Sequence, residues 1–148
     1  MFKISTKGRY GVRFLLDLMV YGGERAVPLR EVAKRQGVSE KYLWQVIHPL
    51  KKAGLVHAEV GSRGGYRLAV GAGQSTLQDI LVALEGRSSL VDCVSSPKAC
   101  DRSAACAVRE VWQELDEKIA QALDAVTLND MAEKHRVKTE PPPLSYTI

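Results

Sequence analysis

The chain has 148 residues, of which 45% are hydrophobic and 26% charged, and its formal net charge is +4. This length suits one domain, or a small domain with an appended arm, and the apolar fraction is sufficient for a buried core. No apolar run approaches the roughly 18 residues of a membrane helix, and the N-terminus lacks the apolar stretch of a signal peptide. These features speak against a membrane protein and predict a cytoplasmic one, whose thiols stay reduced.

Charge is distributed unevenly along the chain. Residues 1–70 carry 13 Lys and Arg against 5 Asp and Glu, whereas residues 71–148 carry 8 against 12. A basic half of this kind is expected of a nucleic-acid binder, although chance clustering gives the same totals. Lys7 and Arg9 stand near the start of the first expected helix, where they are candidates for phosphate contacts or simply a solvated helix end.

The first two-thirds of the chain predict four helices and a hairpin. A helix over 5–22 opens with the capping types Ser5 and Thr6 and carries an apolar face. Residues 28–53 then give a helix, a turn at Gly37 and a second helix capped by Ser39, which is the outline of a helix-turn-helix. Two β-prone runs, 55–60 and 66–70, flank a glycine-rich turn and predict a hairpin, or wing. After a linker at 71–74, a further helix is expected over 77–85.

The second helix of a helix-turn-helix places its N-terminal residues against base edges. Its amide side chains suit adenine, while hydroxyl and ammonium groups suit phosphate. An arginine at the hairpin tip is well placed for a minor groove. The predicted DNA-binding residues are Lys7, Arg9, Ser39, Lys41, Tyr42, Trp44, Gln45 and Arg63. Two of them have alternative interpretations. Tyr42 either packs in the core or contacts the DNA backbone, and Trp44 either contacts a thymine methyl group or is buried.

All three cysteines, Cys93, Cys100 and Cys106, lie in one stretch rich in serine and small residues, which predicts a loop. Three thiols on one short loop can converge on one point. The spacing lacks the short cysteine pair usual in structural zinc sites. A metal cluster or a thiol redox switch is therefore favoured.

A long helix is predicted over 107–126. Its apolar residues follow the 4, 3, 4 spacing of a coiled-coil seam, which favours dimerisation, although packing on its own domain is the alternative. A short helix capped by Thr127 is expected to end near His135, and the proline-rich tail is expected to be disordered. The predicted division is 1–86 DNA-binding region, 87–106 cysteine loop, 107–136 dimerisation and short C-terminal helices, and 137–148 tail.

Several stretches together resemble the winged helix-turn-helix regulators of the IscR, NsrR and CymR type. They are STKGRYG at 5–11, S-x-x-Y-L at 39–43, GLV at 54–56, GGYRL at 64–68, and the three cysteines before a long helix. The resemblance covers about residues 1–135. It implies a mainly α, homodimeric repressor or activator of a double-stranded DNA operator. It also implies that Cys93, Cys100 and Cys106 hold an iron–sulfur cluster, whose occupancy or redox state changes the DNA affinity.

Two positions depart from the pattern of the cluster-binding members. The IscR type has a histidine three residues after the last cysteine, where this chain has Arg109, and the NsrR type has an N-terminal aspartate, where it has about Arg9. The fourth ligand thus stays open among Asp92, Asp101, Glu110, a histidine, a small thiol and water. We favour [2Fe–2S] over [4Fe–4S]. Trp44 stands where IscR-type readers have a glutamate, so the operator sequence is also open.

The sequence therefore predicts a cluster-sensing transcription regulator. A cluster-free thiol switch on the same DNA-binding scaffold is the alternative, and regulation through a partner protein, as in some relatives, is a third possibility that nothing in the sequence indicates. No motif of an enzyme is present, because the chain contains no G-x-S-x-G, H-E-x-x-H or P-loop sequence.

Overall fold

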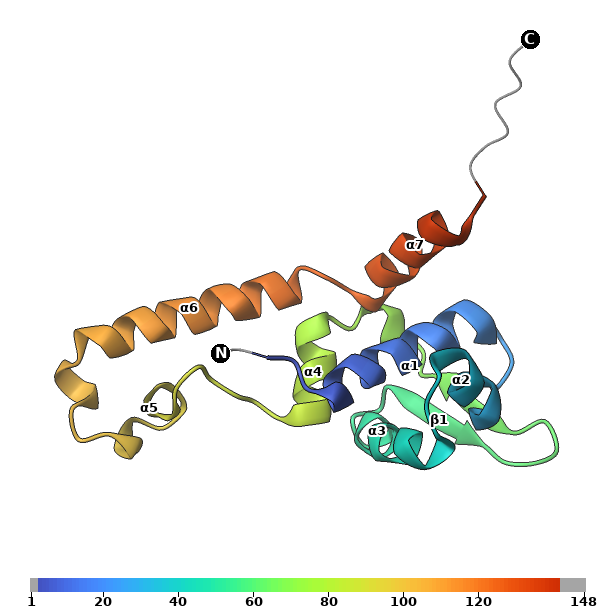
Figure 1. The fold of residues 1–148 in the computed structure, drawn as a ribbon, viewed down its shortest axis with the longest axis horizontal. Coiled ribbons are helices and arrows are strands. Elements are labelled where there is room, and N and C mark those ends of the chain that lie inside the picture. The colour runs from blue at the N-terminus through green and yellow to red at the C-terminus, as the bar shows by residue number, and fades with distance from the viewer. Residues whose placement is uncertain (1–2, 142–148) are drawn as a thin grey trace, which may run out of the picture.

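The fold is built around α1 (Thr6–Gly22), and the computed structural model describes residues 3–141. Ser5 caps α1 by accepting a hydrogen bond from the Gly8 backbone N–H, as its sequence predicts. α1 contacts α2, α3, α4, the hairpin and α7, so it forms the centre of the body in Figure 1. The longest helix and the cysteines extend away from this body on one side.

The predicted helix-turn-helix is present. α2 (Leu29–Gln36) begins after Pro28, and α3 (Glu40–Lys52) begins after its cap Ser39. Gly37 joins them with a φ of 66°, a left-handed conformation that glycine adopts without strain. The apolar faces of both helices pack against α1, which fixes the angle at which α3 is presented.

A two-stranded antiparallel sheet follows α3. β1 (Val56–Glu59) pairs with β2 (Gly65–Leu68), so the strands are shorter than the predicted runs 55–60 and 66–70. Tyr66 also exchanges two backbone hydrogen bonds of 2.9 Å with Val27, which ties the hairpin to the start of α2. A Cβ at Gly65 would lie 2.3 Å from the Val27 carbonyl oxygen, so this close approach requires glycine.

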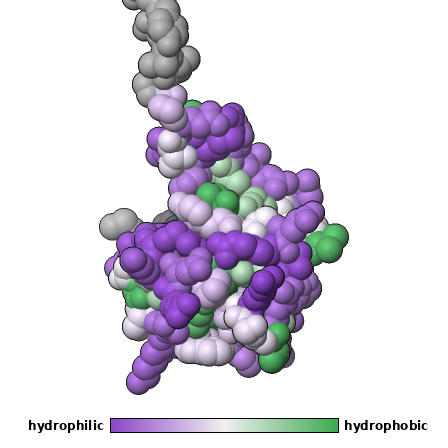
Figure 2. All heavy atoms as spheres, turned by 90° about the vertical axis from the view of Figure 1, so that its right-hand side faces the viewer, coloured by the Kyte–Doolittle hydropathy of each residue, from purple (hydrophilic) through white to green (hydrophobic). Residues whose placement is uncertain are grey.

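A single core joins these elements to α4 (Leu77–Glu85), which follows the short 3-10 turn η1 (Ala72–Gln74). Thr76 and Asp79 form the capping box that their spacing predicts. The fully or almost fully buried apolar side chains of the core are Phe14, Leu15, Leu18, Val27, Val32, Leu43, Val46, Ile47, Leu50, Val56, Ile80, Leu84 and Leu128. The outer face at the α2 and hairpin end is mostly hydrophilic, with only separate apolar spots (Figure 2).

α6 (Ala107–Asp124) leads back from the cysteines, and α7 (Leu128–Thr139) returns to the body, where it packs on α1 and η1. The connection between the two helices is pinned by two backbone hydrogen bonds, from Leu77 N–H to the Val126 carbonyl (2.7 Å) and from Leu128 N–H to the Ser75 carbonyl (3.0 Å). Leu128 is completely buried. One end of α6 is therefore fixed to the DNA-binding body.

Two predictions about local structure were wrong in part. The last helix continues to Thr139, so residues 137–139 are helical where a disordered tail was expected, because Arg136 pairs with Glu133 (2.6 Å) and with Glu140. Residues 142–148 of that predicted tail lie outside the described residues. The predicted cysteine loop contains three short helical turns: α5 (Asp92–Ser95), η2 (Pro97–Ala99) and η3 (Ser103–Ala105). No helix between residues 3 and 141 has the length and apolar content needed to cross a bilayer.

Candidate functional site

α3 has two opposite faces. Leu43, Val46, Ile47 and Leu50 are buried against α1 and α4. The other face is exposed and polar apart from one tryptophan; its members are Glu40, Lys41, Trp44, Gln45, His48, Lys51 and Lys52. Three predicted DNA-binding residues, Lys41, Trp44 and Gln45, therefore share one accessible face.

Ser39 and Tyr42 lie at the start of α3 but have other contacts as well. The Ser39 hydroxyl oxygen accepts a hydrogen bond from the Tyr42 backbone N–H (3.1 Å), which leaves its O–H free to donate to a phosphate. The Tyr42 ring packs edge-on against Tyr10 of α1 at 5.6 Å, and its hydroxyl is buried without a hydrogen-bond partner in the described chain. Tyr42 thus lies at the edge of the core, and its DNA contact stays a prediction.

Two arginines of α1 lie close to the ring of Tyr10. The Arg9 and Arg13 guanidinium groups lie 5.8 and 5.1 Å from the Tyr10 ring centroid. Arg13 also donates a hydrogen bond from Nε to Gln36, the last residue of α2 (2.8 Å). Lys7 is half-buried and Arg9 exposed. The sequence placed Tyr10 on the apolar face and Arg13 among the basic residues of this helix, but it did not predict that they would contact each other. An aromatic residue between two arginines at helical spacing was the available signal.

A buried carboxylate was also missed. The side chain of Asp17 is completely buried and accepts hydrogen bonds from Arg35 (2.7 Å from Nη2) and from Gln36 (2.9 Å). Hydrogen bonding to Asp17 raises the pKa of Arg35, whose guanidinium also stacks over Tyr21 at 4.2 Å. The signal was an aspartate within the apolar face of α1. This network joins α1 to α2 and therefore holds the helix-turn-helix in place.

The hairpin lies beside the exposed face of α3. An open cleft of about 330 Å³ separates them, and Trp44, Glu40 and Glu59 are among the residues that line it. Glu59 forms an ion pair with Arg67 across the two strands (2.9 Å). Arg63 is exposed in the turn between the strands, as expected of a residue at the hairpin tip.

The three cysteines are free thiols placed at three different turns. Cys93 lies in α5 and is half-buried, Cys100 is exposed after η2, and Cys106 is half-buried directly before α6. Thiolates are the donors that iron–sulfur clusters require. Among residues 3–141, however, no three side chains of the metal-binding types are gathered closely enough to hold a metal ion. The donor chemistry suits a cluster, but the geometry does not form a complete site in this conformation.

The segment that contains the three cysteines (residues 87–106, called the cysteine segment below) is connected to α6 by two hydrogen bonds. Arg109 donates from Nε to the Cys93 carbonyl oxygen (2.8 Å), and Asp116 accepts from the Leu90 backbone N–H (2.9 Å). Arg109 therefore holds the segment against α6 and is not free to act as a ligand.

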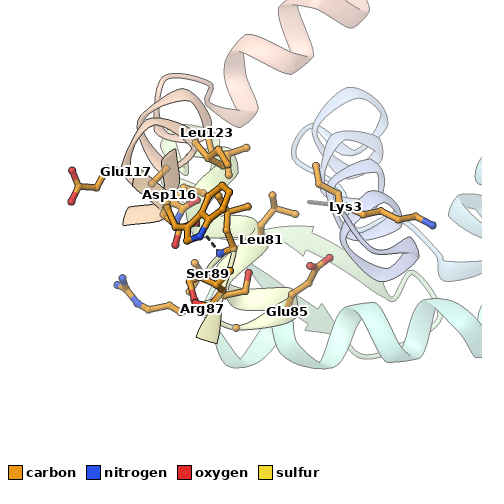
Figure 3. A pocket seen from close by; sticks show the side chains of 18 residues that line it. Lys3, Leu81, Glu85, Arg87, Ser89, Asp116, Glu117 and Leu123 are labelled. Atoms are coloured by element: carbon orange, nitrogen blue, oxygen red, sulfur yellow. Dashed lines mark hydrogen bonds between the residues drawn. The ribbon is translucent and has the colours of Figure 1, made fainter. Parts of the chain in front are cut away.

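Between α4 and α6 lies a cleft of about 790 Å³, into which Leu81 and Glu85 project from α4 and Asp116 and Leu123 from α6 (Figure 3).

A helix-turn-helix followed by a hairpin, with a polar face on its second helix, defines a winged-helix DNA-binding protein. The family model described as Rrf2, "Iron-dependent Transcriptional regulator", matches residues 4–134. The chain is 38% identical over 129 residues to Protein rrf2 of Nitratidesulfovibrio vulgaris, which covers 87% of this chain and 86% of that protein.

Two solved structures extend this likeness to the fold. IscR of T. potens is 35% identical, with a TM-score of 0.77, over 95% of this chain and 93% of that one. The oxidized form of Staphylococcus aureus CymR is 34% identical, with a TM-score of 0.69, over 89% and 97%. The chain belongs to the Rrf2 family, and it is a transcription regulator rather than an enzyme. The predicted family and the predicted fold class are confirmed.

Proposed function

We propose that the chain acts as a homodimer that binds a double-stranded DNA operator through α3 and the hairpin, and that its cysteine segment carries the regulatory signal. The observation that carries the DNA-binding part is the exposed polar face of α3, where Lys41 and Gln45 are accessible in the basic half of the chain. Two such faces, related by two-fold symmetry, suit the two half-sites of a palindromic operator.

Dimerisation through α6 is supported by its exposed apolar surface. None of its 18 residues is buried within one chain. Its apolar residues form two stripes: Trp112, Ile119 and Leu123 line the cleft toward α4, whereas Val108, Val111 and Leu115 do not. Trp112, at 37%, is about as exposed as Leu115. A contiguous apolar stripe on an exposed helix marks an interaction surface. We propose that the stripe of Val108, Val111 and Leu115 packs against the same stripe of a second copy of the chain.

The signal that the segment carries, in this proposal, is an iron–sulfur cluster held by Cys93, Cys100 and Cys106, with [2Fe–2S] favoured over [4Fe–4S]. Three free thiols on one segment, the iron dependence in the family description, and similarity to a solved IscR support it. A bound cluster would supply a charge that depends on its redox state. The residues of this chain would transmit the change, because Arg109 and Asp116 join the segment to α6, which is fixed to the DNA-binding body.

The test is the iron and acid-labile sulfide content of protein purified without oxygen. We expect both in wild-type protein, together with visible absorption bands, and their loss in Cys100→Ala. Ser96→Ala is a matched control on the same segment, since no hydrogen bond involves its hydroxyl in the described structure and the variant should retain the iron. Unchanged iron and sulfide in Cys100→Ala would contradict the ligand assignment.

A thiol switch is the second candidate, and the exposure of Cys100 favours it. In that case two of the thiolates lose two electrons to a peroxide and form a disulfide, while the peroxide is reduced to water. The similar Staphylococcus aureus CymR has been solved in an oxidized form. Iron-free protein that forms a reversible disulfide and thereby changes its operator affinity would support this function. Iron-free protein whose DNA binding ignores peroxide would exclude it.

The role of Arg63 has a separate test. If its guanidinium enters a minor groove or meets a phosphate, Arg63→Ala should weaken operator binding and make the affinity less dependent on salt, since fewer counterions are released. Binding isotherms at several salt concentrations measure both effects. Identical affinity and identical salt dependence in the variant would remove Arg63 from the interface.

A further inference from the structure

Trp44 is the one large apolar side chain on the exposed face of α3. It is 57% exposed, and its neighbours on that face, Lys41 and Gln45, are both exposed and polar. The exposed indole leaves apolar surface in water, and covering that surface with an apolar group of a partner would be favourable by the hydrophobic effect. Its position on the helix that presents side chains to DNA suggests which partner.

The indole is held on a rigid support. Its ring lies edge-on to Tyr66 of the hairpin, with the centroids 6.3 Å apart and the planes at 82°. Tyr66 is itself only 6% exposed, and its backbone is fixed to Val27 by two hydrogen bonds of 2.9 Å. Because Trp44 also stands in the second turn of a well-capped helix, little rotamer freedom is lost when it makes a contact.

The surroundings of Trp44 favour a binding partner that is mostly polar and that offers one apolar group to the indole. On its hairpin side lies the open cleft, which is lined by the charged residues Arg30, Glu40 and Glu59 together with apolar residues such as Pro28 and Leu29. A protein partner would have to cover these charges to reach a single indole. The major groove of DNA instead presents one apolar group among polar edges, the 5-methyl group of thymine.

We propose that Trp44 is a specificity-determining residue that reads a thymine 5-methyl group in the major groove, with Gln45 reading the neighbouring base edge. This inference rests on the proposed operator binding and names the chemistry that the α3 face recognises. It predicts that affinity depends on a methyl group at a defined position of each half-site. Burying one group of methyl size corresponds to about fourfold in affinity.

The experiment compares thymine with deoxyuridine, which lacks only the methyl group. A binding duplex is selected from a random DNA pool, and each thymine is then replaced in turn. For the wild-type protein, one position per half-site should lose about fourfold in affinity. In Trp44→Ala this difference should vanish, and in Trp44→Phe part of it should remain, because an aromatic ring still covers the methyl group. Lys41→Ala is the control: it should bind every duplex more weakly and keep the difference.

Two results would overturn the inference. The first is a selected duplex in which no thymine is sensitive to loss of its methyl group. The second is a Trp44→Ala variant that still distinguishes thymine from deoxyuridine. If that variant also binds both duplexes more weakly by the same factor and melts at a lower temperature, Trp44 only supports the hairpin. If no duplex is selected at all, the proposed operator binding itself fails. This outcome differs from the results above, in which a duplex binds and only the inference about Trp44 fails.

Discussion

Gly11 of α1 lies where α4 crosses that helix. A Cβ there would lie 2.3 Å from Cδ1 of Leu84, which is only 3% exposed. Alanine would gain about 1 kcal/mol of helix propensity, but overpacking typically costs about 1–3 kcal/mol. We therefore expect Gly11→Ala to lower the free energy of unfolding, as measured by urea denaturation.

Gly22→Ala is the matched control, since it lies in the same helix and is also buried. Its new Cβ would lie 3.2 Å from Val27 Cγ2, a contact that a small shift relieves. Its effect on the unfolding free energy should be clearly smaller. If Gly11→Ala were instead the more stable of the two variants, the close crossing of α1 and α4 would be wrong.

Tyr66 links the hairpin to stability at alkaline pH. Burial raises the pKa of its hydroxyl above the ordinary value of 10.0, because the phenolate is poorly solvated there. Above pH 10 the unfolded chain therefore releases this proton more readily than the folded one, so stability falls as pH rises toward the folded pKa. Tyr66→Phe should reduce this fall as the pH rises above 10 and leave stability at pH 7 largely unchanged. An identical pH dependence of the urea midpoint in both proteins would contradict this assignment.

At the scale of elements, a buried ion pair joins α1 to α2, the first helix of the helix-turn-helix. Asp17 has a completely buried side chain, and Arg35 supplies three of its hydrogen bonds. Removing one partner of a buried pair leaves a charge without compensation, which typically costs about 3–5 kcal/mol. Arg35→Met should therefore destabilise the protein by about 3 kcal/mol.

A second substitution separates the charge from lost packing. In the Arg35→Met background, Asp17→Asn should recover part of the stability, because the neutral amide is cheaper to bury and Gln36 remains nearby. A double-mutant cycle from urea denaturation measures the coupling. Strictly additive effects of the two substitutions would show that the ion pair contributes nothing beyond packing.

Elements could be predicted from sequence where a local signal fixed their ends. Ser39, Thr76 and Thr127 cap helices at the predicted positions, and Gly37 makes the predicted turn. The turns of the cysteine segment were missed because they are too short to show periodicity. Contacts between distant residues were missed as well: nothing local to Arg109 indicates that it would bond the Cys93 carbonyl, or that the Tyr42 hydroxyl would be buried.

At the scale of the whole molecule, the proposed dimerisation through the α6 stripe predicts that stability depends on protein concentration. If two copies unfold together, mass action raises the melting temperature by about 2 °C for each tenfold increase in concentration. Leu115 is 38% exposed on the stripe, so Leu115→Glu should yield a monomer whose melting temperature no longer changes with concentration. Glu114→Ala, on a polar position of the same helix, should behave as wild type. A wild-type melting temperature independent of concentration, with a monomeric mass, would contradict dimerisation through α6.

α6 is fixed to the body of the molecule at its C-terminal end, and the cysteines lie at its other end. Its C-terminal end is pinned at Val126 and Leu128, and its 18 residues, at about 1.5 Å each, place Cys106 about 27 Å from that pivot. A displacement of a few ångströms at the cysteines would thus correspond to a rotation of only a few degrees where α6 contacts α4. If the cysteine segment carries the proposed signal, the length of α6 would turn a large movement near Cys106 into a small change of angle at α4, which also packs against α3.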